Sequence, residues 1–91
     1  MAIDDAAAQR KINNRLKRAR GQLDAVIAAA ERGESCRDVV IQLAAVTHAL
    51  NRAGFLMVST AMENCLVDPE GAEERDGITT DELEKLFLAL A

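Results

Sequence analysis

The chain has 91 residues, which is enough for one domain and too little for two. Hydrophobic residues make up 49% and charged residues 29%, a composition typical of a folded globular domain rather than a disordered chain. The formal net charge is -4, and the chain has one His, two Cys and two Phe but no Tyr or Trp. So few His and Cys residues argue against a catalytic triad, a four-ligand zinc site and a disulfide-rich scaffold, and we predict that the protein is not an enzyme.

The first residues do not resemble a targeting segment. The chain begins with an acidic stretch, residues 1–5, that lacks the apolar run of a signal peptide. No uninterrupted stretch approaches the ~18 apolar residues of a membrane span. We therefore predict a cytoplasmic protein with reduced thiols and no membrane partner.

Charge is distributed unevenly along the chain. Residues 1–52 hold nine Lys and Arg against six Asp and Glu, whereas residues 53–91 hold two against nine. A basic block without an acid comprises Arg10, Lys11, Arg15, Lys17, Arg18 and Arg20. Such a block is either a solvated helix face or a phosphate-binding surface. Because aromatic residues are scarce, any nucleic acid bound there should be double-stranded.

Sparse Pro and Gly and the absence of period-2 alternation predict an all-α protomer of three helices. The first helix is predicted at about 5–32, with Asp4 or Asp5 favourable at its start and Gly33 just past its end. Its apolar residues share one face and its basic residues share another. The apolar face comprises Ile12, Leu16, Ala19, Leu23, Val26, Ile27 and Ala30, and the basic face comprises Arg10, Lys11, Arg15, Lys17 and Arg18.

The second helix is predicted at 36–67, with Ser35 as its N-cap, and is unusually long. Its apolar residues nearly encircle the axis, and such a helix needs cover on several sides. Three helices of a 91-residue monomer cannot supply that cover, so we predict self-association. Gly54, in the middle of this helix, fits a close approach of two such helices near a dyad.

An acidic linker, Asp68–Gly77, is predicted to follow the second helix. A capping box formed by Thr79 and Glu82 then predicts a short third helix at 79–90. The apolar residues of this helix lie on one face, which indicates that it packs against the rest of the chain.

The two cysteines occupy opposite ends of the second helix. Cys36 and Cys65 are separated by about 43 Å along the axis, so they cannot meet within one chain, but they lie within about 20° of each other around it. If two such helices pair antiparallel about a dyad near Leu50 and Asn51, Cys36 of one chain meets Cys65 of the other. Cys36 is the better nucleophile, because the N-terminus of a helix favours a thiolate. The alternative is that both cysteines are inert packing residues. His48 is predicted to be a surface or helix-packing residue rather than a ligand.

Five segments of the sequence resemble the copper-sensing operon repressor family (CsoR/RcnR/FrmR). They are Asn14-Arg15-Leu16-Lys17, Arg20-Gly21-Gln22-Leu23-Asp24, Cys36-Arg37-Asp38-Val39, Gln42-Leu43-Ala44-Ala45-Val46 and Leu50-Asn51-Arg52-Ala53. The resemblance implies an antiparallel dimer that forms a four-helix bundle, and a dimer of dimers, the homotetramer. It also implies that the protein binds double-stranded operator DNA and releases it on sensing an inducer. Arg15 and Arg52, with the basic first helix, are the implied DNA contacts.

Branches of the family respond to different inducers, and this chain does not match all of them equally. Copper sensors of the family use a Cys, a His and a second Cys, whereas this chain has Cys36, Ala61 and Cys65. Ser35 replaces a Tyr that often precedes the first cysteine, and Asp81 replaces a Glu of the third helix. The remaining dithiol resembles the persulfide-sensing (CstR-like) branch, which implies low-molecular-weight persulfides or polysulfides as inducer, cross-subunit sulfur bridges and no metal cofactor.

Two alternatives to a persulfide-sensing repressor stay open at this point. The first is a Cu(I)-responsive repressor of the same family, with a bis-thiolate site at Cys36 and Cys65, since Cu(I) is soft and accepts linear thiolate coordination. The second belongs to another class of protein, a helical oligomerisation module with inert cysteines and a solvated basic face.

Overall fold

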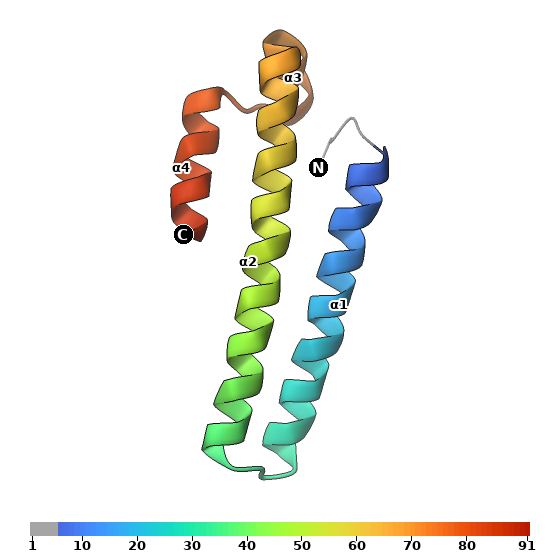
Figure 1. The fold of residues 1–91 in the computed structure, drawn as a ribbon, viewed down its shortest axis with the longest axis vertical. Coiled ribbons are helices and arrows are strands. Elements are labelled where there is room, and N and C mark those ends of the chain that lie inside the picture. Colours follow the sequence, from blue (N-terminus) through green and yellow to red (C-terminus); the bar gives the residue numbers. More distant parts are fainter. Residues whose placement is uncertain (1–5) are drawn as a thin grey trace.

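A computed structural model describes residues 6–91, which form four α-helices and no strand. They are α1 (Ala6–Glu31), α2 (Cys36–Val67), α3 (Pro69–Asp76) and α4 (Thr80–Leu90). α1 and α2 run antiparallel as a long hairpin, and α4 runs back along α2 on the side away from α1 (Figure 1). The all-α class is confirmed, and the bounds of α1, α2 and α4 agree with those of the three predicted helices to within one residue. The predicted helix-start residues Asp4 and Asp5 lie outside the described residues.

The hairpin is closed by two capping motifs separated by few residues. Gly33 has a left-handed φ of 72°, and its N–H donates to Ala30 O while the Glu34 N–H donates to Ala29 O. This pair of hydrogen bonds ends α1 and satisfies carbonyls that the helix leaves free. Ser35 then accepts a hydrogen bond from the Asp38 N–H at 3.2 Å and starts α2, as predicted. The short connection fixes how the two helices are aligned.

Only part of the predicted apolar face of α1 is buried. Ile12, Ala19 and Val26, spaced by seven residues, are buried against α2, the one helix that α1 contacts. Leu16 and Leu23, which share the predicted face, are exposed, because a single neighbouring helix covers one edge of the stripe and leaves the other edge bare. An uncovered apolar stripe therefore runs along α1.

α2 also leaves apolar side chains uncovered over most of its length. Val46, Ala53 and Thr60 are buried at spacings of seven, whereas Leu50 is 45% exposed and Val67 is 87% exposed. By length and composition alone α2 is also apolar enough to cross a membrane. A helix that packs against other helices can have the same length and composition. Whether its neighbours are lipids or helices, so much exposed apolar surface requires a partner that covers it.

The predicted acidic linker after α2 is helical, so the protomer has four helices and not three. Asp68 caps α3 by accepting a hydrogen bond from the Gly71 N–H at 3.1 Å, and Pro69 occupies the first turn, where its missing N–H has no cost. Arg75 in the last turn forms an ion pair with Asp68 at 3.6 Å, and Gly77 ends the helix with a φ of 63°. The prediction took Pro69 as the end of one helix and missed that it starts the next.

Asp68→Ala is expected to lower the free energy of unfolding by about 1 kcal/mol, the usual cost of losing an N-cap. In a domain of this size that loss lowers the melting temperature by about 4–8 °C, measured by circular dichroism. Asp68→Asn is the matched control, since Asn also caps a helix while the exposed ion pair with Arg75 contributes little. Equal melting temperatures for Asp68→Ala and the wild type would contradict the assigned cap.

α4 is held against α2 by three contacts. Leu83 is buried, the rings of Phe55 and Phe87 lie 5.4 Å apart, and Leu90 lies over Gly54. A Cβ at Gly54 would lie 2.9 Å from Leu90 Cδ1, so the missing side chain makes room for α4. The sequence predicted that Gly54 makes room for a second copy of α2. In the structure Leu90 of the same chain occupies that space instead.

Candidate functional site

Basic side chains from two helices meet in the middle of the hairpin. Arg15 and Arg18 of α1 and Arg52 of α2 line a shallow pocket of about 250 Å³, together with Gln22 and Ala49. We call these three arginines the arginine cluster. The alignment of the hairpin explains the meeting: Arg15 precedes Gly33 by 18 residues and Arg52 follows Glu34 by 18 residues. Antiparallel helices of equal rise place two such residues at the same level.

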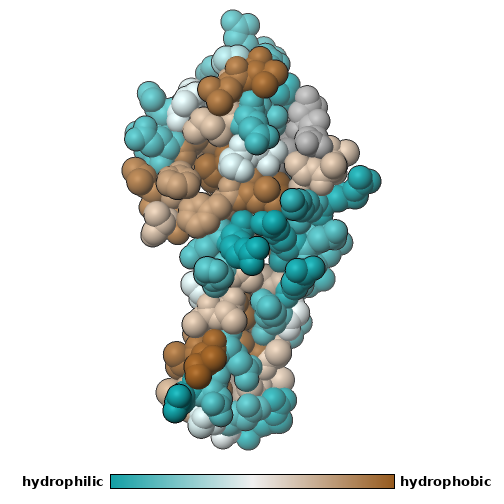
Figure 2. Space-filling model, viewed as in Figure 1, coloured by the Kyte–Doolittle hydropathy of each residue, from teal (hydrophilic) through white to brown (hydrophobic). Residues whose placement is uncertain are grey.

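The arginine cluster is not neutralised. Within the part of the chain that the structure describes, no carboxylate forms an ion pair with any of its three side chains. The other predicted DNA-binding residues, Arg10, Lys11 and Lys17, are all exposed on α1. Figure 2 shows hydrophilic side chains gathered over the middle of α1 and α2. Apolar surface lies over α4 and, low in the view, over the first turns of α2. The basic surface can therefore accept several anionic groups in a row.

Cys36 is the accessible thiol of the pair. It is the first residue of α2, directly after the Ser35 cap, and it is exposed. Arg37 and Asp38 follow it on the first turn, so the thiol lies in a polar, solvated environment.

Cys65 lies in a different environment, near the other end of α2. It is 4% exposed and belongs to a small core with Ala72 of α3 and Leu83 of α4. Four partly buried residues complete this core: Val58, Ala61, Met62 and Ile78. The sequence predicted that Cys65 shares a helix face with Cys36, and the structure adds that α3 and α4 cover Cys65.

The structure does not bring the two thiols together within the protomer, since they lie at opposite ends of α2. It also shows no site for a metal within one chain: among the described residues, no three His, Cys, Asp or Glu side chains are grouped. Ala61 packs against the core that holds Cys65, and its methyl group cannot coordinate a metal.

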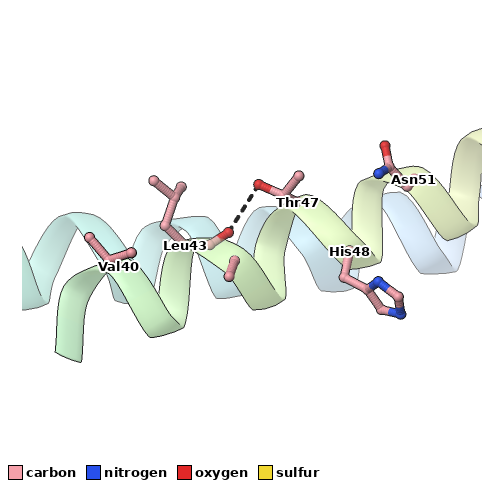
Figure 3. Close-up of a pocket in the computed structure, with 6 residues that line it drawn as sticks. Val40, Leu43, Thr47, His48 and Asn51 are labelled. Carbon is pink, nitrogen blue, oxygen red and sulfur yellow. Dashed lines mark hydrogen bonds between the residues drawn. The ribbon is translucent and has the colours of Figure 1, made fainter. Parts of the chain in front are cut away.

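An apolar groove runs along the first half of α2. It measures about 410 Å³ and is lined by Val40, Leu43, Ala44, Thr47, His48 and Asn51. Figure 3 shows Leu43, Thr47 and Asn51 on one side of the helix and His48 directed away from them, with the Thr47 hydroxyl donating to the Leu43 carbonyl at 3.1 Å. His48 is exposed, in agreement with a place on the surface.

Two features of the site are not indicated by the pattern of any single helix. Gln22 and Ala49 line the arginine pocket, and only the alignment of the hairpin could have placed them there. The cover over Cys65 depends on where the chain turns after α2, for which the Asp68 and Pro69 pair was the available signal.

Comparison with known proteins identifies the class of the protein. The chain belongs to the family of metal-sensitive transcriptional repressors, the CsoR/RcnR family, because the family model matches residues 8–89. Such repressors are not enzymes, in agreement with the prediction. The resemblance stated from the sequence is thereby confirmed at the level of the family.

Three curated proteins are similar to parts of the chain. The copper-sensing transcriptional repressor CsoR of Mycobacterium ulcerans is 46% identical over 52 residues, which are 57% of this chain and 44% of the relative. CsoR of Mycobacterium tuberculosis is 37% identical over 65 residues, 71% of this chain and 55% of the relative. The uncharacterized protein YrkD of Bacillus subtilis is 39% identical over 57 residues, 62% of this chain and 90% of the relative. The chain thus spans about half the length of the copper-sensing relatives. No solved structure matches it significantly.

Proposed function

We propose that this protein is a transcriptional repressor of the cytoplasm that binds double-stranded operator DNA through the arginine cluster. The observation that carries the proposal is the convergence of Arg15, Arg18 and Arg52 from two helices, with no carboxylate partner among the described residues. Arginine forms planar, bidentate contacts with phosphate, and most of the affinity of a protein for duplex DNA comes from such contacts. Arg10, Lys11 and Lys17 extend the surface along α1 and add phosphate contacts.

The proposal includes self-association through the uncovered apolar surface. Leu16 and Leu23 of α1 and Leu43 and Leu50 of α2 are exposed, a pattern that one hairpin cannot bury. A second copy with antiparallel α2 helices supplies the missing neighbour and gives a four-helix bundle. Two such dimers form the homotetramer that the family resemblance implies. Each dimer would present two arginine clusters to the DNA.

Leu50→Asp is expected to dissociate the assembly by at least one step, because it buries a charge in the proposed interface. Light scattering at micromolar concentration measures the change. Ala45→Asp is the control: Ala45 is exposed on the same helix about 140° away around the axis. A wild-type protein that is a folded monomer in this experiment would overturn the proposed assembly, and the cross-subunit thiol site with it.

We further propose that the inducer is sulfane sulfur and that it reacts at Cys36. This thiol is exposed, and an antiparallel pair of α2 helices brings it to the level of Cys65 of the partner subunit. Ala61, beside Cys65, offers no imidazole, which favours covalent chemistry of a dithiol over coordination of a metal by three ligands.

The reaction proceeds by two displacements at sulfur. The Cys36 thiolate attacks the sulfane sulfur of a low-molecular-weight persulfide and forms a Cys36 persulfide, while the donor leaves as its thiolate. Cys65 of the partner subunit then attacks the inner sulfur of that persulfide, forms a disulfide bond and releases hydrosulfide. If Cys65 first carries its own persulfide, the same displacement gives a trisulfide. Each bridge changes the spacing of the two α2 helices, and with it the spacing of the arginine clusters.

A second candidate inducer is Cu(I), favoured by the names of the relatives, which are copper-sensing repressors. The thiols of Cys36 and Cys65 from two subunits would hold the ion as a linear bis-thiolate, in place of the Cys, His and Cys set of the family's copper sensors.

The experiment that tests the proposal is selection of duplexes from a random library by the wild-type protein, followed by anisotropy titration before and after treatment with polysulfide. We expect specific binding to the selected duplexes and loss of affinity after treatment. A chain that assembles but retains no duplex would be a helical oligomerisation module, and the repressor proposal would be wrong.

A further inference from the structure

We propose that α3 and α4 form a cover that must undock from α2 before Cys65 can react, so that the sensing pair has one open and one covered thiol. The inference rests on the proposed function, since it assigns the regulation of the same two thiols. It concerns access to sulfur and is independent of whether the inducer is sulfane sulfur or Cu(I).

The contacts of Cys65 carry the inference. Cys65 is 4% exposed although it lies on the face of α2 that also carries the exposed Cys36. Ala72 of α3 and Leu83 of α4, which are 0% and 1% exposed, close over it. Displacement at sulfur requires the attacking and leaving atoms to reach the sulfur, which this packing prevents. Cys36 of a partner subunit would have to arrive on the side of α2 that the cover occupies.

The cover is attached in a way that permits opening. It consists of helices of 8 and 11 residues, both too short to be stable alone, and both contact α2 but not α1. An apolar groove of about 480 Å³ separates parts of α2 and α4, lined by Phe55, Val58, Ser59, Met62, Thr80, Glu84 and Phe87. Leu83, Leu90 and the ring contact between Phe87 and Phe55 anchor α4, and local opening needs less free energy than global unfolding.

The cover imposes an order on the sensing reaction. Cys36 reacts first because it is exposed, and the bridge closes only during an opening that admits Cys36 of the partner subunit to Cys65. A bridge once formed occupies the place of Leu83 and holds the cover open. The state of the thiols is thereby transmitted to α3 and α4, far from the arginine cluster.

The experiment measures thiol access directly, in the reduced 91-residue chain without inducer or DNA. The protein is pulsed with N-ethylmaleimide, quenched and digested, and the labelled fraction of each cysteine is measured by mass spectrometry. We expect Cys36 to be labelled roughly 30-fold faster than Cys65, or more. Leu83→Ala should accelerate labelling of Cys65 by roughly tenfold or more and leave Cys36 unchanged.

Leu88→Ala is the matched control, because it is the same substitution on the same helix at a side chain that is 63% exposed. If circular dichroism shows that Leu83→Ala loses helix beyond α4, Phe87→Ala replaces it, since this variant removes the ring contact with Phe55 and keeps Leu83. Equal labelling of both cysteines in the wild type overturns the inference, as does an effect of Leu83→Ala, or of its replacement, no larger than that of Leu88→Ala. Neither result decides the proposed function, because DNA binding and the response to inducer are measured in a separate experiment.

Discussion

The double variant Arg15→Ala and Arg52→Ala is expected to bind the selected duplexes about a hundredfold more weakly than the wild type at equal salt, with unchanged helix content. A hydrogen bond to a charged group contributes about 1.5–3 kcal/mol, so two lost arginine–phosphate contacts correspond to a factor of this size or greater. The arginines come from α1 and α2, and their pocket is shallow and open, so their removal leaves the buried seam of the hairpin intact.

The salt dependence tells phosphate contacts apart from an indirect effect. The logarithm of the association constant falls linearly with the logarithm of the salt concentration, with a slope set by the number of neutralised phosphates. Each single variant should reduce the magnitude of that slope by about one, and the double variant by about two. Anisotropy titrations at four or five salt concentrations supply the slopes.

Arg32→Ala is the control for these titrations. Arg32 is also an exposed arginine at the end of α1, but it forms an ion pair with Glu34 at the closed end of the hairpin, away from the arginine cluster. This variant should keep both the affinity and the slope of the wild type. Unchanged affinity in the double variant would mean that the DNA-binding surface lies elsewhere, whatever the family.

Single residues explain why most helix ends were predictable. Ser35 and Thr79 each accept a hydrogen bond from the N–H three residues later, and Gly33 takes the left-handed conformation that few other residues adopt. These interactions lie within four residues of sequence, so the sequence alone indicates them. α3 was missed because Asp68 caps two helices at once, ending α2 and starting α3. A single residue that both stops and starts a helix resembles a linker in the sequence.

The candidate site was predictable only in part, because periodicity gives a direction around one helix and no neighbour. The basic face of α1 followed from periodicity, but the meeting of Arg15 with Arg52 required the alignment set by the short turn at Gly33 and Glu34. The burial of Cys65 depends on how α4 returns along α2, a contact between residues 18 apart in sequence, Cys65 and Leu83. Nothing in the local pattern of α2 indicates this.

The largest expected chemical effect is a covalent link between two chains after treatment with polysulfide. Intact mass under denaturing, non-reducing conditions should show two chains linked by a disulfide, or that mass plus a whole number of sulfur atoms, with a parallel loss of DNA affinity. Cys36→Ser should abolish both effects, because it removes the exposed thiol that reacts first. Cys65→Ser should still gain a persulfide on Cys36 but form no cross-link. Modification without a fall in affinity would separate the thiol chemistry from DNA release.

Ala61→His distinguishes sulfane sulfur from Cu(I) as the inducer. Ala61 is partly buried beside Cys65, so an imidazole there would restore the Cys, His and Cys set of the family's copper sensors. A third, nitrogen ligand should strengthen Cu(I) binding by roughly tenfold or more and make stoichiometric Cu(I) release the DNA. The wild type, in contrast, is expected to respond to polysulfide and only poorly to Cu(I). Competition with a Cu(I) chelator measures the affinity. The opposite pattern has an equally plain meaning: a wild-type protein that releases DNA with stoichiometric Cu(I), and that polysulfide leaves unchanged in mass and affinity, is a copper sensor. In that protein two thiolates suffice, and Ala61 marks a reduced ligand set rather than a different inducer.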